Sequence, residues 1–556
     1  MIKKNNVGRG SGNGKQSAYG IKKLRELILD LAVRGKLVPQ DPNDEPASKL
    51  LEKIEADPST LRQAQSKQLR GRSSKQNPLP EIADDEKPFD LPKGWEWFRI
   101  GNYFDFQYGK ALKAEERNET GNVNVYGSNG IVGKHNTALS NEPCIVIGRK
   151  GSAGALNKAY EPSWTTDVAY YFIPPNGFYF DFTFELLKSL NIEDLGKGIK
   201  PGINRNEVYL KIAALPPLAE QKRIVAKVDE LMALCDRLEE KQNENQATHE
   251  NLVETLLGSL TAPDHIKNQK EFIANWRRVS QNFATVFTSE ASIEKLKSTI
   301  LQLAVMGKLV EQDSSDEPAS KLLEKIAGEK EKLIADGKIK KQKPLPEITD
   351  EEKPFELPEG WVWVRLGEIS NLITKGSSPK WQGVEYTKNS DDILFITSEN
   401  VGSYKLIIES KKYVEKKFNE IEPRSILQKG DFLMNIVGAS IGRTAIFTLP
   451  EIANINQAVC LIRIDTDLLV KIFLLHFFNS EICISYMFDK QVDNARANLS
   501  MGNISNFLIP LPPLAEQKRI VDKVDELMAI CDSLKEKIAQ NRATAVKLAD
   551  AVVGVG

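Results

Sequence analysis

The chain has 556 residues, of which 41% are hydrophobic, and a formal net charge of −1 at pH 7. This length exceeds that of one ordinary domain and predicts three or four structural units. The near-neutral charge excludes an extended polyanion-binding surface, so that any nucleic-acid site must be a local patch or must be shared with a partner.

The N-terminal part of the chain reads as a tail followed by a helical frame. Residues 1–18 are rich in Lys, Gly, Asn and Ser without an apolar segment, and we expect a disordered tail there. Residues 19–95 are expected to form a helical frame and a linker. Four residues in this frame form an apolar stripe with helical spacing, namely Leu24, Leu27, Ile28 and Leu31. The acid-acid-proline run at 44–46 is typical of the start of a second helix.

The chain is a tandem repeat. Three blocks recur in order: 21–54 at 293–326, 79–101 at 345–367, and 215–241 at 511–537. In the first block, 25 of 34 positions are identical. The copies lie 272, 266 and 296 residues apart, so the insert between the second and third blocks differs in length by 30 residues. The inserts, 102–214 and 368–510, show no comparable identity, and two similar frames therefore carry two different variable modules.

This pattern predicts an α+β (mixed) fold with pseudo-two-fold repetition. Both variable modules, which we place at 96–214 and 362–510, are expected to be α/β with short strands. The segments after them, 215–260 and 511–556, are expected to be long helices. Residues 261–361 repeat the helical frame and its linker.

The third block carries a heptad-like seam. Its apolar positions step by 3, 4 and 3 residues in both copies: Val228, Leu231, Cys235 and Leu238, and then Val524, Leu527, Cys531 and Leu534. This spacing predicts two antiparallel coiled-coil helices, each about 60 Å long, in which the first set packs against the second. The two cysteines are expected to act as small hydrophobic residues in the seam.

Basic residues gather in glycine-rich turns of the modules. In the first module they are Arg149, Lys150, Lys200 and Arg205; in the second they are Lys375, Lys380 and Arg443. Such turns present backbone amides together with Ser, Asn and Arg side chains, which suit phosphates and base edges. A purely structural interpretation stays open, in which Arg149 and Arg443 only brace the turns.

Two repeated motifs make the chain resemble a known family. They are L-P-P-L-A-E-Q-K-R-I-V at 215–225 and 511–521, and a Gly-Trp pair at 94–95 and 360–361. The chain resembles the specificity subunit of type I restriction-modification enzymes, and D-E-P-A-S-K-L-L-E-K-I suggests the branch with a long N-terminal helical extension. Turns similar to the family's target recognition domains add further candidate DNA contacts: Ser128, Asn129, Ser152, Asn204, Ser377, Ser378, Asn456 and Gln457.

The resemblance implies a role in double-stranded DNA recognition. Each of two target recognition domains would read one half of a split site, and the long helices would set the distance between them. Two methyltransferase subunits would methylate adenine with S-adenosylmethionine, and two restriction subunits would complete the cutting enzyme. ATP and Mg²⁺ would likewise be used by partner subunits, whereas this chain would bind no cofactor or metal. The expected location is the cytoplasm of a bacterium or archaeon.

Sequence motifs for catalysis are missing. The chain has no G-x-x-x-x-G-K-[ST] loop and no N-P-P-Y or D-P-P-Y motif. Its five cysteines and four histidines form no C-x-x-C or H-x-x-x-H pair, and no apolar run reaches membrane-spanning length. The acid-lysine strings at 85–87 and 351–353 lie in proline-rich linkers. Two alternatives stay open: a DNA methyltransferase or nuclease with fused recognition domains, and a coiled-coil adaptor that binds only protein.

Overall fold

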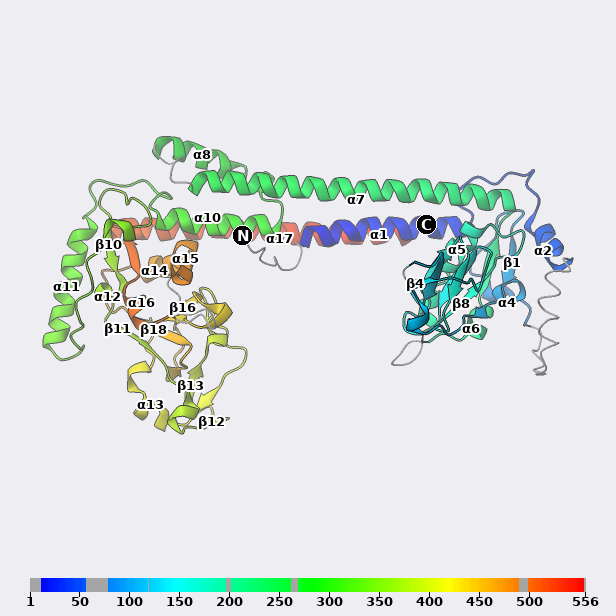
Figure 1. Ribbon diagram of the computed structural model, residues 1–556. Coiled ribbons are helices and arrows are strands. Elements are labelled where there is room, and N and C mark those ends of the chain that lie inside the picture. The colour runs from blue at the N-terminus through cyan, green and yellow to red at the C-terminus, as the bar shows by residue number, and fades with distance from the viewer. Residues whose placement is uncertain are drawn as a thin grey trace. The chain divides into compact units, whose positions relative to one another are not determined.

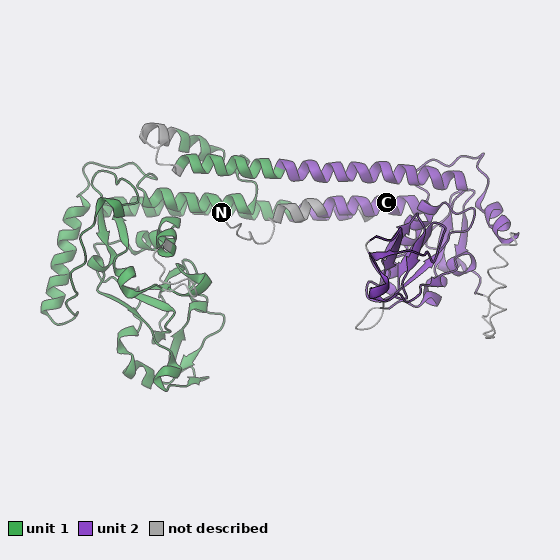
Figure 2. Ribbon diagram, viewed as in Figure 1, with its two compact units in different colours: residues 1–13, 246–542 green, residues 14–245, 543–556 purple. Residues whose placement is uncertain are grey.

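The computed structural model describes residues 12–56, 79–118, 120–196, 202–261, 269–489 and 499–554. It contains both helices and sheets, with one sheet-containing module in each half of the chain (Figure 1). The chain divides into two compact units, coloured separately in Figure 2. Unit 1 comprises residues 1–13 and 246–542, and unit 2 comprises residues 14–245 and 543–556.

The first frame belongs to unit 2. Its helices are α1 (Gly12–Val33) and α2 (Ala47–Ala56), so α1 begins inside the stretch expected to be a tail. Directly after α1, Gly35 adopts a left-handed φ of 67°. A Cβ at Gly35 would also lie 2.5 Å from the Pro92 side chain, so both the conformation and the space require glycine. This turn places the end of α1 against the repeated Gly-Trp segment.

The first variable module is built from two small sheets. One has the strand order β2 (Gln107–Tyr108), β8 (Ala169–Phe172), β5 (Cys144–Gly148) and β6 (Leu156–Ala159). The other has the order β4 (Gly130–His135), β3 (Val123–Gly127) and β7 (Ser163–Thr165), and β3 pairs with β7 in parallel. Three helices complete the module, namely α4 (Ile100–Tyr103), α5 (Phe180–Ser189) and α6 (Arg205–Tyr209).

The second frame belongs to unit 1 and adds helices before the repeated block. Its helices are α8 (Gln269–Gln281), α9 (Phe283–Val286), α10 (Glu290–Val305) and α11 (Ala319–Ala335). Helix α10 begins at a capping box, in which the Ser289 hydroxyl accepts from the Ser292 amide at 3.1 Å. Trp276 and Val279 of α8 and Phe283 of α9 pack into the same hydrophobic cluster as α10.

The second variable module repeats the order of the first sheet and adds an edge strand, β12, to the second sheet. Its first sheet runs β11 (Leu372–Lys375), β18 (Val459–Arg463), β15 (Phe432–Asn435) and β16 (Thr444–Ile446). Its second sheet runs β12 (Tyr386–Thr387), β14 (Tyr413–Val414), β13 (Ile393–Ile396) and β17 (Ala453–Ile455), again with a parallel final pair. The helices are α12 (Leu366–Ile369), α13 (Lys417–Ile421), α14 (Lys471–Phe478), α15 (Glu481–Asp489) and α16 (Met501–Ser505).

Each module starts and ends on one short antiparallel ribbon. In the first, β1 (Glu96–Arg99) pairs with β9 (Ile212–Leu215). In the second, β10 (Val362–Arg365) pairs with β19 (Leu508–Leu511). Strands β1 and β10 lie in a repeated block, and β9 and β19 end at the first residue of the next repeated block, so both modules are attached at equivalent positions.

Each ribbon leads through two prolines into a long helix. These helices are α7 (Leu218–Thr261, 44 residues) and α17 (Leu514–Gly554, 41 residues), as the heptad pattern predicted. The neighbours of the seam differ from the expectation, however. Val228 and Cys235 lie in a cluster with Ile21 and Ile28 of α1.

The second set of seam residues has its own cluster. Val524, Leu527, Cys531 and Leu534 pack with residues of α10, including Ile293 and Ile300. Each seam thus packs against the frame helix of its own repeat. The reason is that these seams occupy the N-terminal part of each long helix. There the apolar stripe of the frame helix is buried against them. Leu238 is 45% exposed and lies on the surface instead of in a seam.

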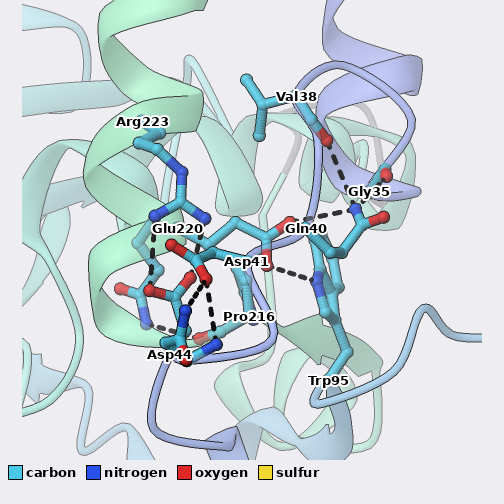
Figure 3. Close-up of polar contacts among 11 residues, drawn as sticks. Gly35, Val38, Gln40, Asp41, Asp44, Trp95, Pro216, Glu220 and Arg223 are labelled. Atoms are coloured by element: carbon cyan, nitrogen blue, oxygen red, sulfur yellow. Dashed lines mark hydrogen bonds and ion pairs between the residues drawn. The ribbon is translucent and has the colours of Figure 1, made fainter.

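A buried carboxylate fixes the start of each long helix, and Figure 3 shows the one at the start of α7. Glu220 accepts from the Gln40 amide at 3.1 Å and from the Trp95 indole at 3.0 Å, while Arg223 pairs with Asp44 at 2.7 Å. Burial raises the pKa of Glu220, and the two donors oppose this shift. The second repeat reproduces the arrangement with Gln312, Trp361, Glu516, Asp316 and Arg519. The identical residues of the repeated blocks are therefore explained by identical contacts.

A buried arginine in each repeat explains the acid-lysine strings. Arg99 is 2% exposed, pairs with Glu86 at 2.9 Å and donates to the Pro80 and Leu210 carbonyls. Arg365 makes the same contacts with Glu352, Pro346 and Asn506. The hydrogen bond from Arg99 lowers the pKa of Glu86. These acids therefore hold the linker against the ribbon.

Candidate nucleic-acid interface

Three loops of the first module meet at one surface. A Cβ on Gly148 would lie 2.4 Å from the Ser128 carbonyl and 2.1 Å from the Ser152 carbonyl, so the β3–β4 turn packs directly on the glycine-rich turn. The Ile203 amide donates to the Arg149 carbonyl at 3.0 Å and brings in the third loop. The structure thus gathers most of the predicted contacts of this module.

These residues differ in their exposure to solvent and in the structural hydrogen bonds that they make. Asn129, Lys150 and Ser152 are exposed, and Ser128 is half-buried. Asn204 has a structural task as well, because its side-chain oxygen accepts from the Asn206 amide at 3.0 Å and caps α6. Lys200 lies outside the described residues.

An aromatic ring joins the two arginines of this surface. The guanidinium of Arg205 lies 4.8 Å from the ring centroid of Tyr108, and that of Arg149 lies 5.3 Å from the same ring. Arg149 is also 5.9 Å from the buried Tyr170 ring. Tyr108 itself is 51% exposed, so the cluster opens to solvent. Two cations over one ring form an oriented, positively charged patch.

Carbonyl groups fix the orientation of both guanidinium groups. Arg149 donates from Nε and Nη2 to the Asp167 carbonyl at 3.1 and 2.7 Å, and Arg205 donates from Nη1 to the Phe106 carbonyl at 2.8 Å. Since a guanidinium has five N–H donors, each arginine keeps donors for an external acceptor. Held in place in this way, these donors suit the paired acceptors of a guanine edge or a phosphate.

In the second module the predicted residues gather around the end of β11. Lys375 is exposed at the last position of that strand. A Cβ on the next residue, Gly376, would lie 1.9 Å from the Ile455 carbonyl and 2.6 Å from that of Asn456, so this segment packs tightly on the end of β17. Asn456 braces its own turn by accepting from the Ala458 amide at 3.1 Å.

The remaining candidates of this module line the same segment or lie apart from it. Ser377 accepts from the Gln382 amide at 2.9 Å, Ser378 and Gln457 are half-buried, and Lys380 is exposed. Arg443 is exposed just before β16, at the opposite edge of the sheet from β11. Three strand spacings of roughly 4.8 Å separate the two edges, so Arg443 lies about 14 Å from the Lys375 group.

The two modules use equivalent backbone positions for different side chains. The hydrogen bond from Ile203 to Arg149 corresponds to one from Leu499 to Ile436, at 3.1 Å. Strand register likewise places Lys375 of β11 at the position of Tyr108 of β2.

Two further positions complete this comparison. Met501 and Arg205 are both the first residue after a helix cap, and Cys460 stands in the place of Tyr170. An arginine-tyrosine cluster in one module is thus replaced by an apolar cluster with one lysine in the other.

Tyr108 is a residue of this surface that the sequence interpretation missed. The signal was present, because Tyr108 precedes Gly109 as Lys375 precedes Gly376, and both glycines approach a neighbouring backbone too closely for a side chain. Trp381, which is 73% exposed beside Lys380, was missed as well. Neither residue belongs to a repeated block, so the comparison of the frames did not draw attention to them.

The residues that the structure describes contain no group of three or more His, Cys, Asp or Glu side chains arranged to hold a metal ion. Among their helices, none combines the length and apolarity needed to cross a membrane.

Comparison with known proteins identifies the family. Residues 92–249 and 358–541, together more than half of the chain, match the family model described as type I restriction modification DNA specificity domain. The chain is 38% identical to the type I restriction enzyme EcoAI specificity subunit of Escherichia coli, over 98% of this chain and 95% of that protein. It is 36% identical to the EcoEI specificity subunit of the same species, with the same coverage.

A solved structure is also similar. The crystal structure of the HsdS subunit from Thermoanaerobacter tengcongensis matches 84% of this chain and 97% of that one, with 20% identity and a TM-score of 0.42. The family match and the two full-length relatives carry the assignment. The chain belongs to the type I restriction-modification DNA specificity family, and it is a non-catalytic subunit that supplies DNA sequence specificity.

Proposed function

We propose that the two modules read two different half-sites of one asymmetric, bipartite DNA sequence. The observation that carries this proposal is the contrast at equivalent positions. The positions of Arg149, Tyr108 and Arg205 in the first module are occupied by Ile436, Lys375 and Met501 in the second. Because base reading depends on donor and acceptor patterns, such different groups on one scaffold select different bases.

In the first module, Arg149 and Arg205 are the proposed base-contacting residues. An arginine whose plane is fixed by a carbonyl and a ring can present two parallel N–H groups to the O6 and N7 acceptors of guanine. Ser128, Asn129, Lys150, Ser152 and Asn204, which lie around it, then contact phosphates and neighbouring bases. In the second module, Lys375, Ser377, Ser378, Lys380, Asn456 and Gln457 form the corresponding surface, and Arg443 contacts the DNA backbone from the far sheet edge.

The repeated frames are the proposed docking surfaces for catalytic partners. Two like frames offer two equivalent sites to two copies of one protein, which fits two methyltransferase subunits. Leu252 of α7 and Leu548 of α17 occupy equivalent positions and are 63% and 65% exposed. Exposed leucines kept in both copies suggest an apolar contact that each partner makes in the same way.

The rest of the assembly follows from this role. Two restriction subunits complete the cutting enzyme, and the methyl donor S-adenosylmethionine, ATP and Mg²⁺ are used by the partners and not by this chain. The proposed location is the cytoplasm, where the DNA substrate is found.

Selection of bound duplexes from a random library tests the bipartite reading. The complex of this chain with its methyltransferase subunits is expected to enrich two short, unlike sequence elements separated by a spacer of fixed length and free sequence. A single continuous element, or a palindrome, would contradict the proposal.

A further inference from the structure

Unit 1 contains a basic cleft that lies apart from the recognition surface of the second module. Its volume is about 720 Å³, and it lies between the linker after α11 and the base of the module. Six basic side chains line it: Lys338, Lys340, Lys341, Lys343, Arg424 and Arg463. Asp465 is the one acid among its lining residues.

Four of these six cations form no ion pair within the part of the chain that the structure describes. Arg463 is neutralised by Asp431 at 2.6 Å, and Lys338 lies 3.2 Å from Asp336. Lys340, Lys341 and Lys343 are exposed, as is Arg424. Within the ranges that the structure describes, these four make no side-chain hydrogen bond or ion pair. Four unpaired cations facing one cleft repel each other unless an anion joins them.

Neutral hydrogen-bonding groups complete the lining. Asn371, Gln428, Ser505 and Asn506 contribute amide and hydroxyl groups. The Asn506 side-chain oxygen is buried without a partner, whereas its nitrogen donates to the Gly502 carbonyl at 3.0 Å. Lysine and arginine combined with Asn, Gln and Ser are the side chains that contact DNA phosphates and sugars.

The position of the cleft relates it to the recognition surface. Leu372 and Ile373 at the start of β11 line the cleft, and Lys375 at the end of the same strand belongs to the proposed reading surface. Four residues of strand span about 10 Å, close to the rise of three base pairs. A duplex read at Lys375 therefore has backbone phosphates within reach of the cleft.

The sequence of the first repeat points the same way. Its corresponding linker, 62–80, contains no acidic residue. It carries five basic residues, namely Arg62, Lys67, Arg70, Arg72 and Lys75. The two linkers thus share basic charge, and basic charge alone is enough for phosphate contacts that do not depend on the DNA sequence.

We propose that the cleft formed by Lys340, Lys341, Lys343 and Arg424 binds the phosphate backbone of the DNA next to the second half-site. This contact adds affinity that does not depend on base sequence. It rests on the proposed reading surface of the second module, since that surface brings the duplex to the cleft.

The test uses the full complex with its methyltransferase subunits and a triple variant, Lys340→Gln, Lys341→Gln and Lys343→Gln. Affinity for cognate and non-cognate duplexes is measured from 50 to 200 mM salt. The logarithm of the affinity falls with the logarithm of the salt concentration with a slope of about −0.9 per phosphate contact. If the variant loses three contacts, the ratio of wild-type to variant affinity should shrink roughly 40-fold over this range. The methylated sequence is expected to stay unchanged. The matched control replaces three lysines of α11 outside the cleft: Lys321→Gln, Lys325→Gln and Lys332→Gln.

Two outcomes overturn the inference. If the cleft variant and the control variant show the same salt dependence as the wild type, the cleft does not bind DNA. If the wild type instead binds ATP or inorganic phosphate, and the variant loses only this binding, the cleft serves a free anion. Failure of the wild-type complex to separate cognate from non-cognate duplexes would contradict the proposed function and not the cleft alone.

Discussion

Tyr108 restricts how far each of the two neighbouring guanidinium groups can move. The ring holds Arg205 at 4.8 Å and Arg149 at 5.3 Å, while carbonyls hold their other sides. A donor that is already oriented loses less entropy on binding, so it discriminates better between correct and incorrect acceptors.

Substitution of these arginines separates reading from bracing. Arg205→Ala is expected to cost roughly 1–3 kcal/mol at one base pair if Arg205 reads a base, because its bidentate partner is lost. If Arg149 or Lys375 touches only phosphate, its alanine variant should weaken all sequences evenly and lower the salt slope by about one.

Binding of the complex to a set of single-base variants of its site provides this measurement. Lys188→Gln, on α5 of the same module, serves as the control for charge. Unchanged affinity and salt slope in Arg149→Ala would mean that this arginine only braces its turn through the Asp167 carbonyl.

A buried histidine gives the second module a defined dependence on pH. His476 on α14 is 4% exposed, its Nδ1 lies 3.1 Å from the Tyr404 hydroxyl, and burial lowers its pKa to about 4. The neutral form is favoured in the fold, so its stabilising effect is complete above the unfolded pKa of about 6.5. It is lost as the pH falls toward 4, because the unfolded chain then takes up the proton first.

Urea unfolding from pH 7 to pH 4 tests this consequence. The free energy of unfolding of the wild type should fall by up to roughly 3 kcal/mol more than that of His476→Gln, which keeps a hydrogen-bonding group but does not titrate. His135→Gln in the first module is the control. Parallel pH dependence of the wild type and His476→Gln would show that His476 does not titrate as its burial requires.

At the scale of elements, the repeat predicted far more than the modules did. Helices α7 and α17 follow from the prolines that precede them and from the heptad spacing of their apolar residues. The neighbours of their seams did not follow, since a periodic stripe shows that a face is buried but not which helix covers it. The register of β2 and β11 also had no sequence signal, because two-residue and four-residue strands are too short for an alternation pattern.

Lengthening the long helices should lengthen the DNA spacer. We expect insertion of four residues after Asn245, and of four after Arg542, to add about one helical turn of 6 Å to each. At 3.4 Å per base pair, the preferred spacer should grow by one or two base pairs while both half-sites stay the same. The insertion points lie at the boundaries between the two units and spare the core of each. An active complex with an unchanged spacer would show that these helices do not set it.

The exposed leucines of α7 and α17 should control how many methyltransferase subunits bind. Leu252→Glu and Leu548→Glu should each remove one subunit, and the double variant should remove both, because a buried unpaired carboxylate opposes an apolar contact. The mass of the purified complex reports the number directly. Gln242→Glu, at an exposed polar position of α7, is the control. Two bound subunits in the double variant would place the docking surface elsewhere.

At the scale of the molecule, duplication explains how one chain carries two different modules on similar frames. The frames keep the same contacts, down to Glu220 with Trp95 and Glu516 with Trp361. The modules between them are joined to the frames by the ribbons β1–β9 and β10–β19. Equivalent module positions therefore carry different side chains on the same frame, as Arg205 and Met501 illustrate.

Exchange of one module tests this central claim most directly. Residues 102–214 are replaced by the corresponding module of a family member with another specificity, and the complex is expressed in a host without other adenine methylation. Sequencing of single DNA molecules then gives the methylated motif. We predict that one half-site changes while the other half-site and the spacer remain. A motif in which both half-sites change together, or in which neither changes, would contradict the account.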